Sequence, residues 1–473
     1  MLSRRRLLEL SIANASALAW KFSPARAATP SACVNDITRL NPIEVRTIAT
    51  PSSTVETQRL VGDWRGPISI GGARYSMGGQ IGAEESLHLD MRGFNRIVNL
   101  DVERMTVRVQ SGMRWRDLQE LIDPHGLSVK IMQSYSNFTV GGALSVNAHG
   151  RYVGLGPVVN SVRGIQLVLP DGNVVEANRT QNSELFRGAI GGYGGLGVVT
   201  EIELDLVPNM KIERQTTSLA LNDYVAFFKE RIRSNSDAVF HNANLEFPHF
   251  DRALLVTWVK TENPVTVAAR LHTSGKADLS EVASVWALSE FPSAHYLRQE
   301  FFDPLQYRSR AVVWRNYEAS LDVASLGPIA TNASTYALQE YFVPPDQLAE
   351  FAREMARILE KHDVNALNVS IRHSPSDTEA LLAWAQREVF SFVLYYKQSV
   401  SNGAKERVGR WTRELIDAAL SVGGTYYLPY QLHATRQQFN QAYPRATDFF
   451  ALKAKVDPRN QFRNKLWEKY AGA

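Results

Sequence analysis

Three glycine-rich segments between residues 71 and 200 constrain this chain more than any other feature. They are loop one at 71–80 (GGARYSMGGQ), loop two at 139–150 (TVGGALSVNAHG) and loop three at 191–200 (GGYGGLGVVT). Glycine lets successive backbone N–H groups point into one concavity, and such a concavity binds phosphate oxygens. A single loop of this kind is often only a tight turn between strands. Three within one region indicate a phosphate or pyrophosphate site.

Loop three also matches the G-x-G-x-x-G fingerprint of dinucleotide-binding folds, through Gly192, Gly194 and Gly197. That fingerprint functions only when a strand precedes it and a helix follows, because the pyrophosphate must meet a helix N-terminus. Here the predicted order is reversed, with a helix at 183–189 before the loop and a strand at 198–206 after it. The sequence therefore argues against a Rossmann-type nicotinamide site.

The pattern around the loops predicts an α+β chain. Short strand-like runs dominate up to about residue 207, and Pro170-Asp171-Gly172 separates two of them as a hairpin turn. Ser53 and Glu56 have the spacing of a capping box before a short helix. Beyond residue 211, longer helices alternate with strands, for example a helix at 345–361 with one apolar face.

In this order and spacing, the three loops resemble the PCMH-type FAD-binding domain of the vanillyl-alcohol oxidase and p-cresol methylhydroxylase family. Near the C-terminus, Asp457-Pro458-x-x-x-Phe462-x-Asn464 resembles the closing motif of the aldonolactone and alditol oxidase branch, which includes D-arabinono-1,4-lactone oxidase. The resemblance implies a flavin domain of two α+β subdomains and a substrate domain with an antiparallel sheet flanked by helices. The expected divisions are an export signal at 1–27, a linker at 28–44, the FAD-binding domain at 45–207, the substrate domain at 211–400 and a C-terminal segment returning to the FAD domain at 401–473.

The same resemblance implies a function. The chain would be a FAD-dependent oxidoreductase that oxidises a CH–OH group of a small hydroxylated substrate, such as a sugar, a sugar lactone or an alcohol, by hydride transfer to flavin N5. Oxygen, a quinone or a cytochrome would reoxidise the flavin, and the sequence does not choose among them.

The resemblance assigns the cofactor to residues of all three loops. Loop one would bind the FAD pyrophosphate, loop two the pyrophosphate and ribityl region with its last residues near the isoalloxazine ring, and loop three the adenine side. The expected FAD-binding residues are Gly71, Gly72, Ala73, Arg74, Tyr75, Ser76, Gly79 and Gln80 in loop one, Thr139, Gly141, Gly142, Ala143, Asn147, His149 and Gly150 in loop two, and Gly192, Gly197 and Val199 in loop three.

The catalytic residues of that branch are only partly present. Its members use a Glu-x-Arg pair on a central strand and a lysine near the C-terminus. Here the matching strand reads Ser370-Ile371-Arg372, so the carboxylate is absent, and the lysine position matches Tyr430, a candidate base. Neighbouring strand residues face opposite sides, so only one of Gln339 and Glu340 can face the substrate. The catalytic candidates are Arg372, Tyr430, Glu340, Gln339 and His149.

Each catalytic candidate also has an ordinary structural explanation. Arg372 could be an ordinary surface or ion-pair residue, and Tyr430 could belong to the core. Glu340 could be solvated, and His149 could serve only to orient the backbone. Because the expected Glu and Lys are missing, an exported flavin-binding accessory protein with little or no turnover stays an alternative. A nicotinamide-dependent dehydrogenase is the third, which the visible absorbance of a flavin near about 450 nm would exclude.

The first 27 residues differ from the remainder of the chain. They hold five of the 52 basic and one of the 48 acidic residues, so the remainder is neutral and offers no general attraction for nucleic acid. Arg4 and Arg5 before a weakly apolar stretch, with Ala25-Arg26-Ala27 after it, resemble a twin-arginine export signal. We therefore expect a periplasmic or otherwise exported protein without a spanning helix, since no apolar run approaches roughly 20 residues.

We predict that FAD is bound without a covalent link. Many relatives attach the flavin through a histidine of the first loop, and the matching residue here is Tyr75. Cys33 is the single thiol and lies far from the loops in sequence, which also excludes a zinc site of several cysteines. Denaturing the purified yellow protein should release all flavin into the soluble fraction. Flavin that stays with the precipitated polypeptide would contradict this expectation.

Overall fold

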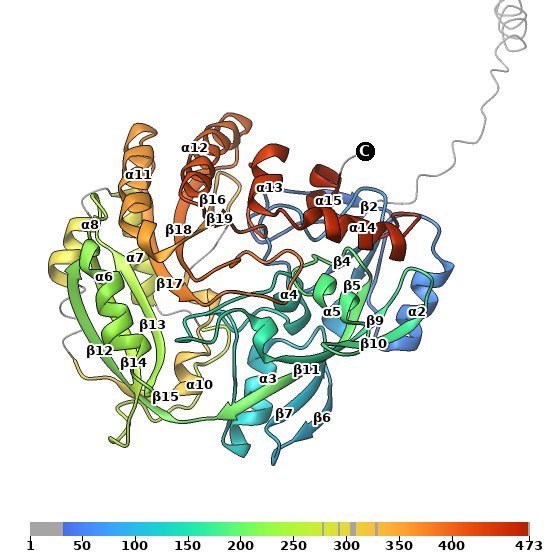
Figure 1. The fold of residues 1–473 in the computed structure, drawn as a ribbon, viewed down its shortest axis with the longest axis horizontal. Coiled ribbons are helices and arrows are strands. Elements are labelled where there is room, and N and C mark those ends of the chain that lie inside the picture. The colour runs from blue at the N-terminus through green and yellow to red at the C-terminus, as the bar shows by residue number, and fades with distance from the viewer. Residues whose placement is uncertain (1–31, 277–278, 292–293, 303–308, 327–329, 472–473) are drawn as a thin grey trace, which may run out of the picture.

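The computed structural model describes residues 32–471 except 277–278, 292–293, 303–308 and 327–329. The expected export signal at 1–27 lies outside the described residues. Figure 1 shows two bodies side by side, a first domain at 32–208 and a second domain at 211–426. The remaining residues, 427–471, form a segment that we call the C-terminal strap.

The first domain contains one small parallel sheet and one larger antiparallel sheet. The parallel sheet has the order β3-β5-β4, and the larger sheet has the order β10-β9-β11-β7-β6, with β8 pairing only β11. The strands of the parallel sheet are β3 (Thr47–Ala49), β4 (Ile68–Gly71) and β5 (Leu87–Asp90), and those of the larger sheet are β6 (Ile97–Asp101), β7 (Thr106–Gln110), β8 (Leu127–Val129), β9 (Val162–Val168), β10 (Val174–Asn178) and β11 (Val198–Pro208).

The second domain is built on an eight-stranded antiparallel sheet. Its order is β15-β12-β14-β13-β17-β18-β16-β19, and in Figure 1 it runs from β12 at the left edge toward β16 beside the first domain. The strands are β12 (Lys211–Ala220), β13 (Ala238–Leu245), β14 (Arg252–Lys260), β15 (Val312–Trp314), β16 (Ser334–Val343), β17 (Ala366–Ser374), β18 (Val389–Ser399) and β19 (Thr425–Tyr426).

Helices form where the sequence places apolar stripes and caps. The helices of the first domain are α2 (Thr54–Asp63), α3 (Trp115–Ile122), α4 (Val140–Ser145) and α5 (Ser183–Ala189); those of the second domain are α6 (Leu221–Phe227), α7 (Leu279–Glu290), α8 (Ala294–Leu297), α10 (Arg315–Glu318), α11 (Leu348–Lys361) and α12 (Asn402–Ser421); those of the strap are α13 (Arg436–Ala442), α14 (Ala446–Val456) and α15 (Lys465–Tyr470). As predicted, the Ser53 side chain caps α2 by accepting from the Glu56 backbone N–H. None of the described helices is long and apolar enough to cross a bilayer.

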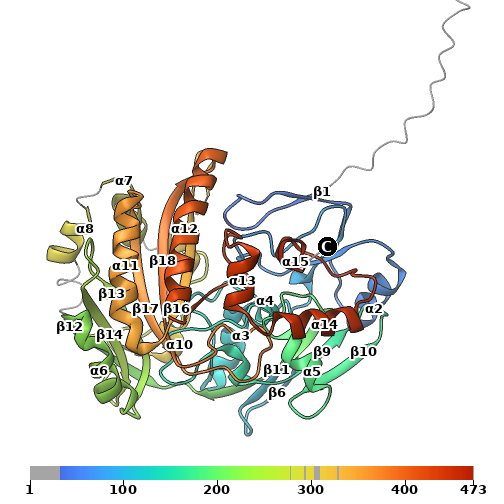
Figure 2. The same cartoon turned by 45° about the horizontal axis from the view of Figure 1, so that its top comes forward.

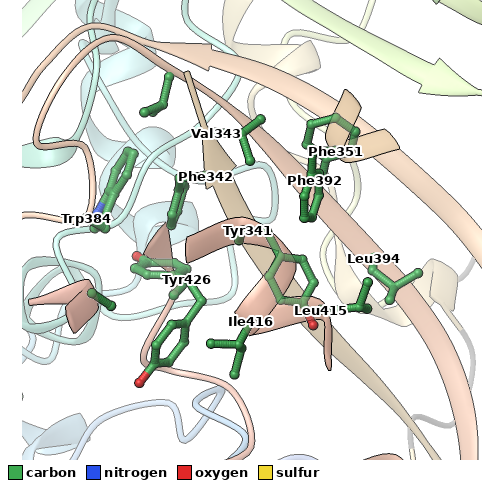
Figure 3. Packing of buried hydrophobic residues seen from close by; sticks show 14 of the residues in the cluster. Tyr341, Phe342, Val343, Phe351, Trp384, Phe392, Leu394, Leu415, Ile416 and Tyr426 are labelled. Carbon is green, nitrogen blue, oxygen red and sulfur yellow. The ribbon is translucent and has the colours of Figure 1, made fainter. Parts of the chain in front are cut away.

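One face of the large sheet is apolar and is covered by helices. Val369, Ile371 and Phe392 from the sheet join the apolar sides of α11 and α12 in the largest hydrophobic core of the described chain. Figure 3 shows part of this core, with Phe351 of α11 beside Phe392 of β18. The opposite face of the sheet is free to carry polar side chains.

Two boundaries differ from the sequence prediction. The described part of the expected linker contains β1 (Ala32–Val34) and β2 (Ile43–Val45), which pair with each other and bury Val34 and Val45. The region from 401 to 426 belongs to the second domain, because α12 packs on its sheet and β19 pairs with β16. Only from about residue 427 does the chain return to the first domain.

The C-terminal strap closes onto the glycine loops. Figures 1 and 2 both show α13, α14 and α15 above the first domain. Phe462 lies beside Ile68 as a short parallel addition to β4, with backbone hydrogen bonds on both sides of it. Lys453 donates to the Gly195 carbonyl of loop three at 2.9 Å and to the Asp457 carboxylate at 2.9 Å. The motif that resembles the closing sequence of relatives is therefore a buried clasp.

We predict that Asp457→Ala destabilises the protein strongly. The Lys453 and Asp457 side chains are 6% and 0% exposed, so removing the carboxylate leaves a buried, uncompensated ammonium. Such a change costs about 3–5 kcal/mol of unfolding free energy. Asp448→Ala, on the exposed surface of the helix that carries Lys453, is the matched control and should change stability by less than about 0.5 kcal/mol. Equal denaturation midpoints for the two variants would rule out the clasp.

Candidate active site

A cavity lies where the first domain meets the large sheet. It contains about 1750 Å³ of empty space, part of it open to solvent, and all three glycine loops contribute to its wall. The expected site residues that line it are Gly72, Ala73, Arg74, Tyr75, Ser76, Gln80, Thr139, Gly141, Gly142, Ala143, His149, Gly197, Val199, Glu340, Arg372 and Tyr430. Residues that are distant in sequence therefore meet at one site.

Loop one supplies free backbone donors. It follows β4 directly, and the backbone N–H groups of residues 72–76 make no hydrogen bond to any described residue. A Cβ on Gly72 would lie 2.3 Å from Thr139 Oγ1, so glycine is required where loops one and two touch. Five successive unpaired N–H groups on a cavity wall form an anion-binding nest. Loop one is the strongest candidate for holding a pyrophosphate.

Loop two lines the cavity, but its backbone donors are not free. The Gly141 N–H donates to the Ser111 carbonyl at 2.7 Å, and the Gly142 N–H donates to Thr139 Oγ1 at 3.3 Å. The Ala143 N–H donates to the Thr139 carbonyl as the first turn of α4 forms. These donors are already used within the protein. Loop two therefore shapes the cavity wall, while loop one offers the free N–H groups.

Several expected ligand positions do not line the cavity. Gly71, Gly79, Gly150 and Gly192 are packing positions: a Cβ on Gly150 would lie 2.2 Å from the Met132 carbonyl, and one on Gly192 would lie 2.0 Å from the Gly188 carbonyl. Asn147 is fully buried and donates to Asp377 at 2.7 Å, which anchors loop two to the second domain. In a sequence, a glycine required for packing looks the same as one required for a ligand.

The second domain contributes a buried charged cluster to the cavity. Glu340 of β16 places Oε1 2.6 Å from His149 Nε2, and Tyr430 donates its hydroxyl to Glu340 Oε2 at 3.3 Å. Arg372 of β17 lines the same cavity, and its Nε is buried with no hydrogen-bond partner among the described residues. His149 of loop two, Glu340 and Arg372 of the large sheet and Tyr430 of the strap therefore meet at one cavity.

Aromatic packing holds His149 in place. Its ring centroid lies 4.7 Å from that of Trp384, and Phe342 stacks on Trp384 at 4.3 Å. Figure 3 shows Trp384 and Phe342 side by side. The Trp384 Nε1 donates to the Asn147 carbonyl at 3.0 Å, two residues before His149. The histidine is therefore oriented from both its ring and its backbone.

The electrostatics of the cluster favour an ionised carboxylate and a neutral phenol. Burial alone would raise the pKa of Glu340, but the His149 charge and hydrogen bond, together with the Arg372 charge, bring it below its usual value of 4.5. Burial, and then the Glu340 charge, hold the pKa of Tyr430 well above 10. A phenol that stays protonated is a donor. The hypothesis that Tyr430 is the base is therefore not supported.

Gln339 was also expected as a candidate, and the structure assigns it elsewhere. Its side chain points to the helix-covered face of the sheet, where Nε2 donates to Thr412 at 2.6 Å and to Tyr396 at 3.2 Å. Because side chains alternate along β16, only one of Gln339 and Glu340 can face the cavity, and that residue is Glu340. Gln80 lines the cavity but also has a structural task, because it donates to the Leu428 and Tyr430 carbonyls and so positions Tyr430.

The sequence-based reasoning missed several polar residues of the cavity. Ser111 Oγ, Gln133 Nε2 and Ser134 Oγ are buried on its wall without hydrogen-bond partners among the described residues, as is Arg74 Nε. Buried polar atoms are normally paired, so a group of unpaired ones around one cavity indicates a ligand. The local sequence signal that could have identified Ser111 is its position directly after β7 and before a glycine.

The residues present fit FAD. The nest at 72–76 suits a pyrophosphate, and the unpaired atoms of Ser111, Gln133 and Ser134 suit the hydroxyls and ring edges of a flavin nucleotide. The buried cluster around Glu340 lies on the same cavity, on the wall formed by the second domain. No group of three or more His, Cys, Asp or Glu in the described chain could hold a metal ion.

Comparison with known proteins agrees with this geometry. A family model described as FAD binding domain matches residues 45–178, and a model described as D-arabinono-1,4-lactone oxidase matches residues 202–470. L-gulonolactone oxidase of Bos taurus is 24% identical over 401 residues, covering 82% of this chain and 86% of that protein.

Two further relatives extend the comparison. The mitochondrial L-galactono-1,4-lactone dehydrogenase of Brassica oleracea is 31% identical over 186 residues, covering 39% of this chain and 30% of that protein. Decaprenylphosphoryl-beta-D-ribose oxidase of Mycolicibacterium smegmatis is 23% identical over 421 residues, covering 85% of this chain and 88% of that protein. Because the lactone-oxidase model spans more than half of the sequence, this chain belongs to the D-arabinono-1,4-lactone oxidase family of FAD-dependent oxidoreductases.

Proposed function

We propose that the enzyme oxidises a CH–OH carbon of a sugar-like substrate, with Glu340 accepting the hydroxyl proton while hydride leaves the same carbon. The observation that carries this proposal is the buried Glu340–His149 pair, with a separation of 2.6 Å, on the wall of the cavity that the glycine loops line. Relatives named as lactone oxidases, a lactone dehydrogenase and a ribose oxidase support a sugar-like substrate. FAD supplies the hydride acceptor when bound.

Glu340 is placed to act as a general base, although its lowered pKa makes it a weaker base than an unperturbed carboxylate. Its depressed pKa keeps it ionised at neutral pH, and a carboxylate accepts several hydrogen bonds, so a substrate hydroxyl can join those from His149 and Tyr430. The C–H bond breaks with its electron pair leaving toward the cofactor, the O–H proton passes to Glu340, and the carbon becomes a carbonyl. Arg372 contributes positive charge at the site where negative charge develops.

Strand register explains how a carboxylate is present although the Glu-x-Arg pair is incomplete. Ser370 stands where that motif has its glutamate, and it pairs with Val393 of β18. Val393 also pairs with Glu340 of β16, so Glu340 and Ser370 share one row across the sheet and point to the same face. We infer that the carboxylate is supplied from β16 in place of β17. This weakens the case for an accessory protein without turnover.

We expect Glu340→Gln to slow flavin reduction by about 10²–10⁴-fold, the range associated with losing a general base. Tyr430→Phe is the matched control, since it removes a neighbouring hydroxyl that stays protonated, and it should lower the rate by less than about tenfold. Anaerobic stopped-flow bleaching of the flavin with a panel of aldoses and aldonolactones measures both rates. Both variants should keep the flavin spectrum of the wild type. A Glu340→Gln variant with wild-type reduction would remove Glu340 from the mechanism.

The pH dependence of the same reaction separates the possible bases. The pKa of Glu340 is held below 4.5, so the ionised form persists to acidic pH, and the rate should fall only when pH drops below that value. A base of Tyr430 type would instead produce a rate that keeps rising above pH 10. The measurement is the first-order rate of flavin reduction at saturating substrate from pH 4 to 10.5. A rise on the alkaline side would favour Tyr430 over Glu340.

A further inference from the structure

A second cavity lies on the same sheet face as the active site, farther from the flavin loops. Its sheet wall carries the uncharged polar side chains of Thr216 and Ser218 from β12, Asn244 from β13 and Asn368 from β17. The aromatic side chains of Phe247 and Phe250 line another side. A few polar groups combined with aromatic surface are typical of a small-ligand site.

Strand register places residues of the two cavities in one row across the sheet. Asn244 pairs with Ser370, Ser370 with Val393, and Val393 with Glu340, so these four side chains form one row on one face. Glu340 and Val393 line the first cavity, and Asn244 lines the second. Three strand spacings separate Glu340 from Asn244, roughly 14 Å. That distance is longer than one sugar ring.

Several uncharged polar side chains of this row and of the second cavity are not used by the described part of the protein. Those of Thr216, Ser218, Asn244, Asn368 and Ser370 make no hydrogen bond to any described residue. Ser370, midway between the cavities, is only 7% exposed. A half-buried amide that faces a cavity without a protein partner is available to a ligand. The opposite face of the same strands is packed with apolar side chains. The polar residues are therefore confined to the face that carries the cavities.

The chemistry of the second cavity favours a neutral, hydroxyl-rich ligand. Amides and hydroxyls both donate and accept hydrogen bonds, which matches sugar hydroxyls. The wall also includes His295 and one residue of each charge, Glu246 and Arg298, so it has no cationic cluster that would select an anion. A phosphate or a carboxylate would be expected to meet a cationic cluster instead.

We propose that this second cavity is a subsite for a further sugar unit, so that the substrate is a disaccharide or longer glycoside with its oxidised unit at Glu340 and its next unit toward Asn244. The inference rests on the proposed function, because it places the reacting unit beside Glu340. It goes beyond that function by specifying the length of the substrate.

Equilibrium binding to the FAD-loaded full-length protein tests the subsite without turnover. Isothermal titration with paired probes, each common hexose and pentose against its homodisaccharides, should identify a disaccharide that binds at least about tenfold more tightly than its monosaccharide, since two or three added hydrogen bonds give that gain. In Asn244→Leu the advantage should fall to about twofold or less, with monosaccharide binding unchanged. Asn99→Leu, the same substitution on an exposed strand of the first domain, is the matched control and should keep the full advantage.

The outcomes separate this inference from the proposed function. If no disaccharide binds more tightly than its monosaccharide, or if Asn244→Leu keeps the full advantage, the subsite is wrong. Ser218→Val, at an exposed position, gives the same test if Asn244→Leu does not fold. If a disaccharide binds preferentially but never bleaches the flavin under anaerobic conditions, the subsite stands and the proposed oxidation fails. Bleaching by monosaccharides alone, with no preference in binding, supports the oxidation and overturns the subsite.

Discussion

Five unpaired N–H groups in loop one can bind a cofactor only if the surrounding structure holds the loop open, and hydrogen bonds from distant parts of the chain do this. The Ile37 N–H donates to the Arg74 carbonyl, and the Met77 N–H donates to the Pro429 carbonyl of the strap. Gln80 reaches the strap as well, through the Leu428 and Tyr430 carbonyls. A loop without internal hydrogen bonds would otherwise rearrange to satisfy its own donors. The cofactor site therefore depends on both ends of the described chain.

The same strap that supports loop one delivers Tyr430 to the active site. Its backbone is held by Gln80, and its hydroxyl reaches Glu340. Glu340 in turn bonds His149, whose preceding residues are tied to the second domain by Asp377 and Trp384. The cofactor loops, the proposed proton acceptor Glu340 and the strap are thus joined by one chain of hydrogen bonds. A change in the strap is expected to affect both flavin binding and catalysis.

The large sheet separates stability from recognition by using its two faces differently. One face packs against α11 and α12 and supplies most of the hydrophobic core of the second domain. The other carries Glu340, Arg372 and Asn244 toward the two cavities. Because side chains alternate along every strand, each strand contributes to both tasks without conflict. Polar residues on the second face can therefore vary with the substrate while the core stays intact.

The sequence by itself determined the local features. Loops one to three, the Ser53 cap, the hairpin at Pro170-Asp171-Gly172 and the strands from β16 to β18 all follow from glycine, capping and alternation rules, which involve only neighbouring residues. Motif resemblance added the family and the cofactor. Alternation along a strand correctly limited Gln339 and Glu340 to a choice of one.

Tertiary structure alone decided which of these residues act together. Whether a glycine such as Gly150 serves packing or a ligand depends on Met132, which approaches it from another loop. The pairing of His149 with Glu340 joins residues 191 positions apart, and the placing of Glu340 in one row with Ser370 depends on the register of three strands. Hydrogen bonding, burial and charge act through space at a few ångströms, and no local pattern records which distant side chains the fold will bring that close.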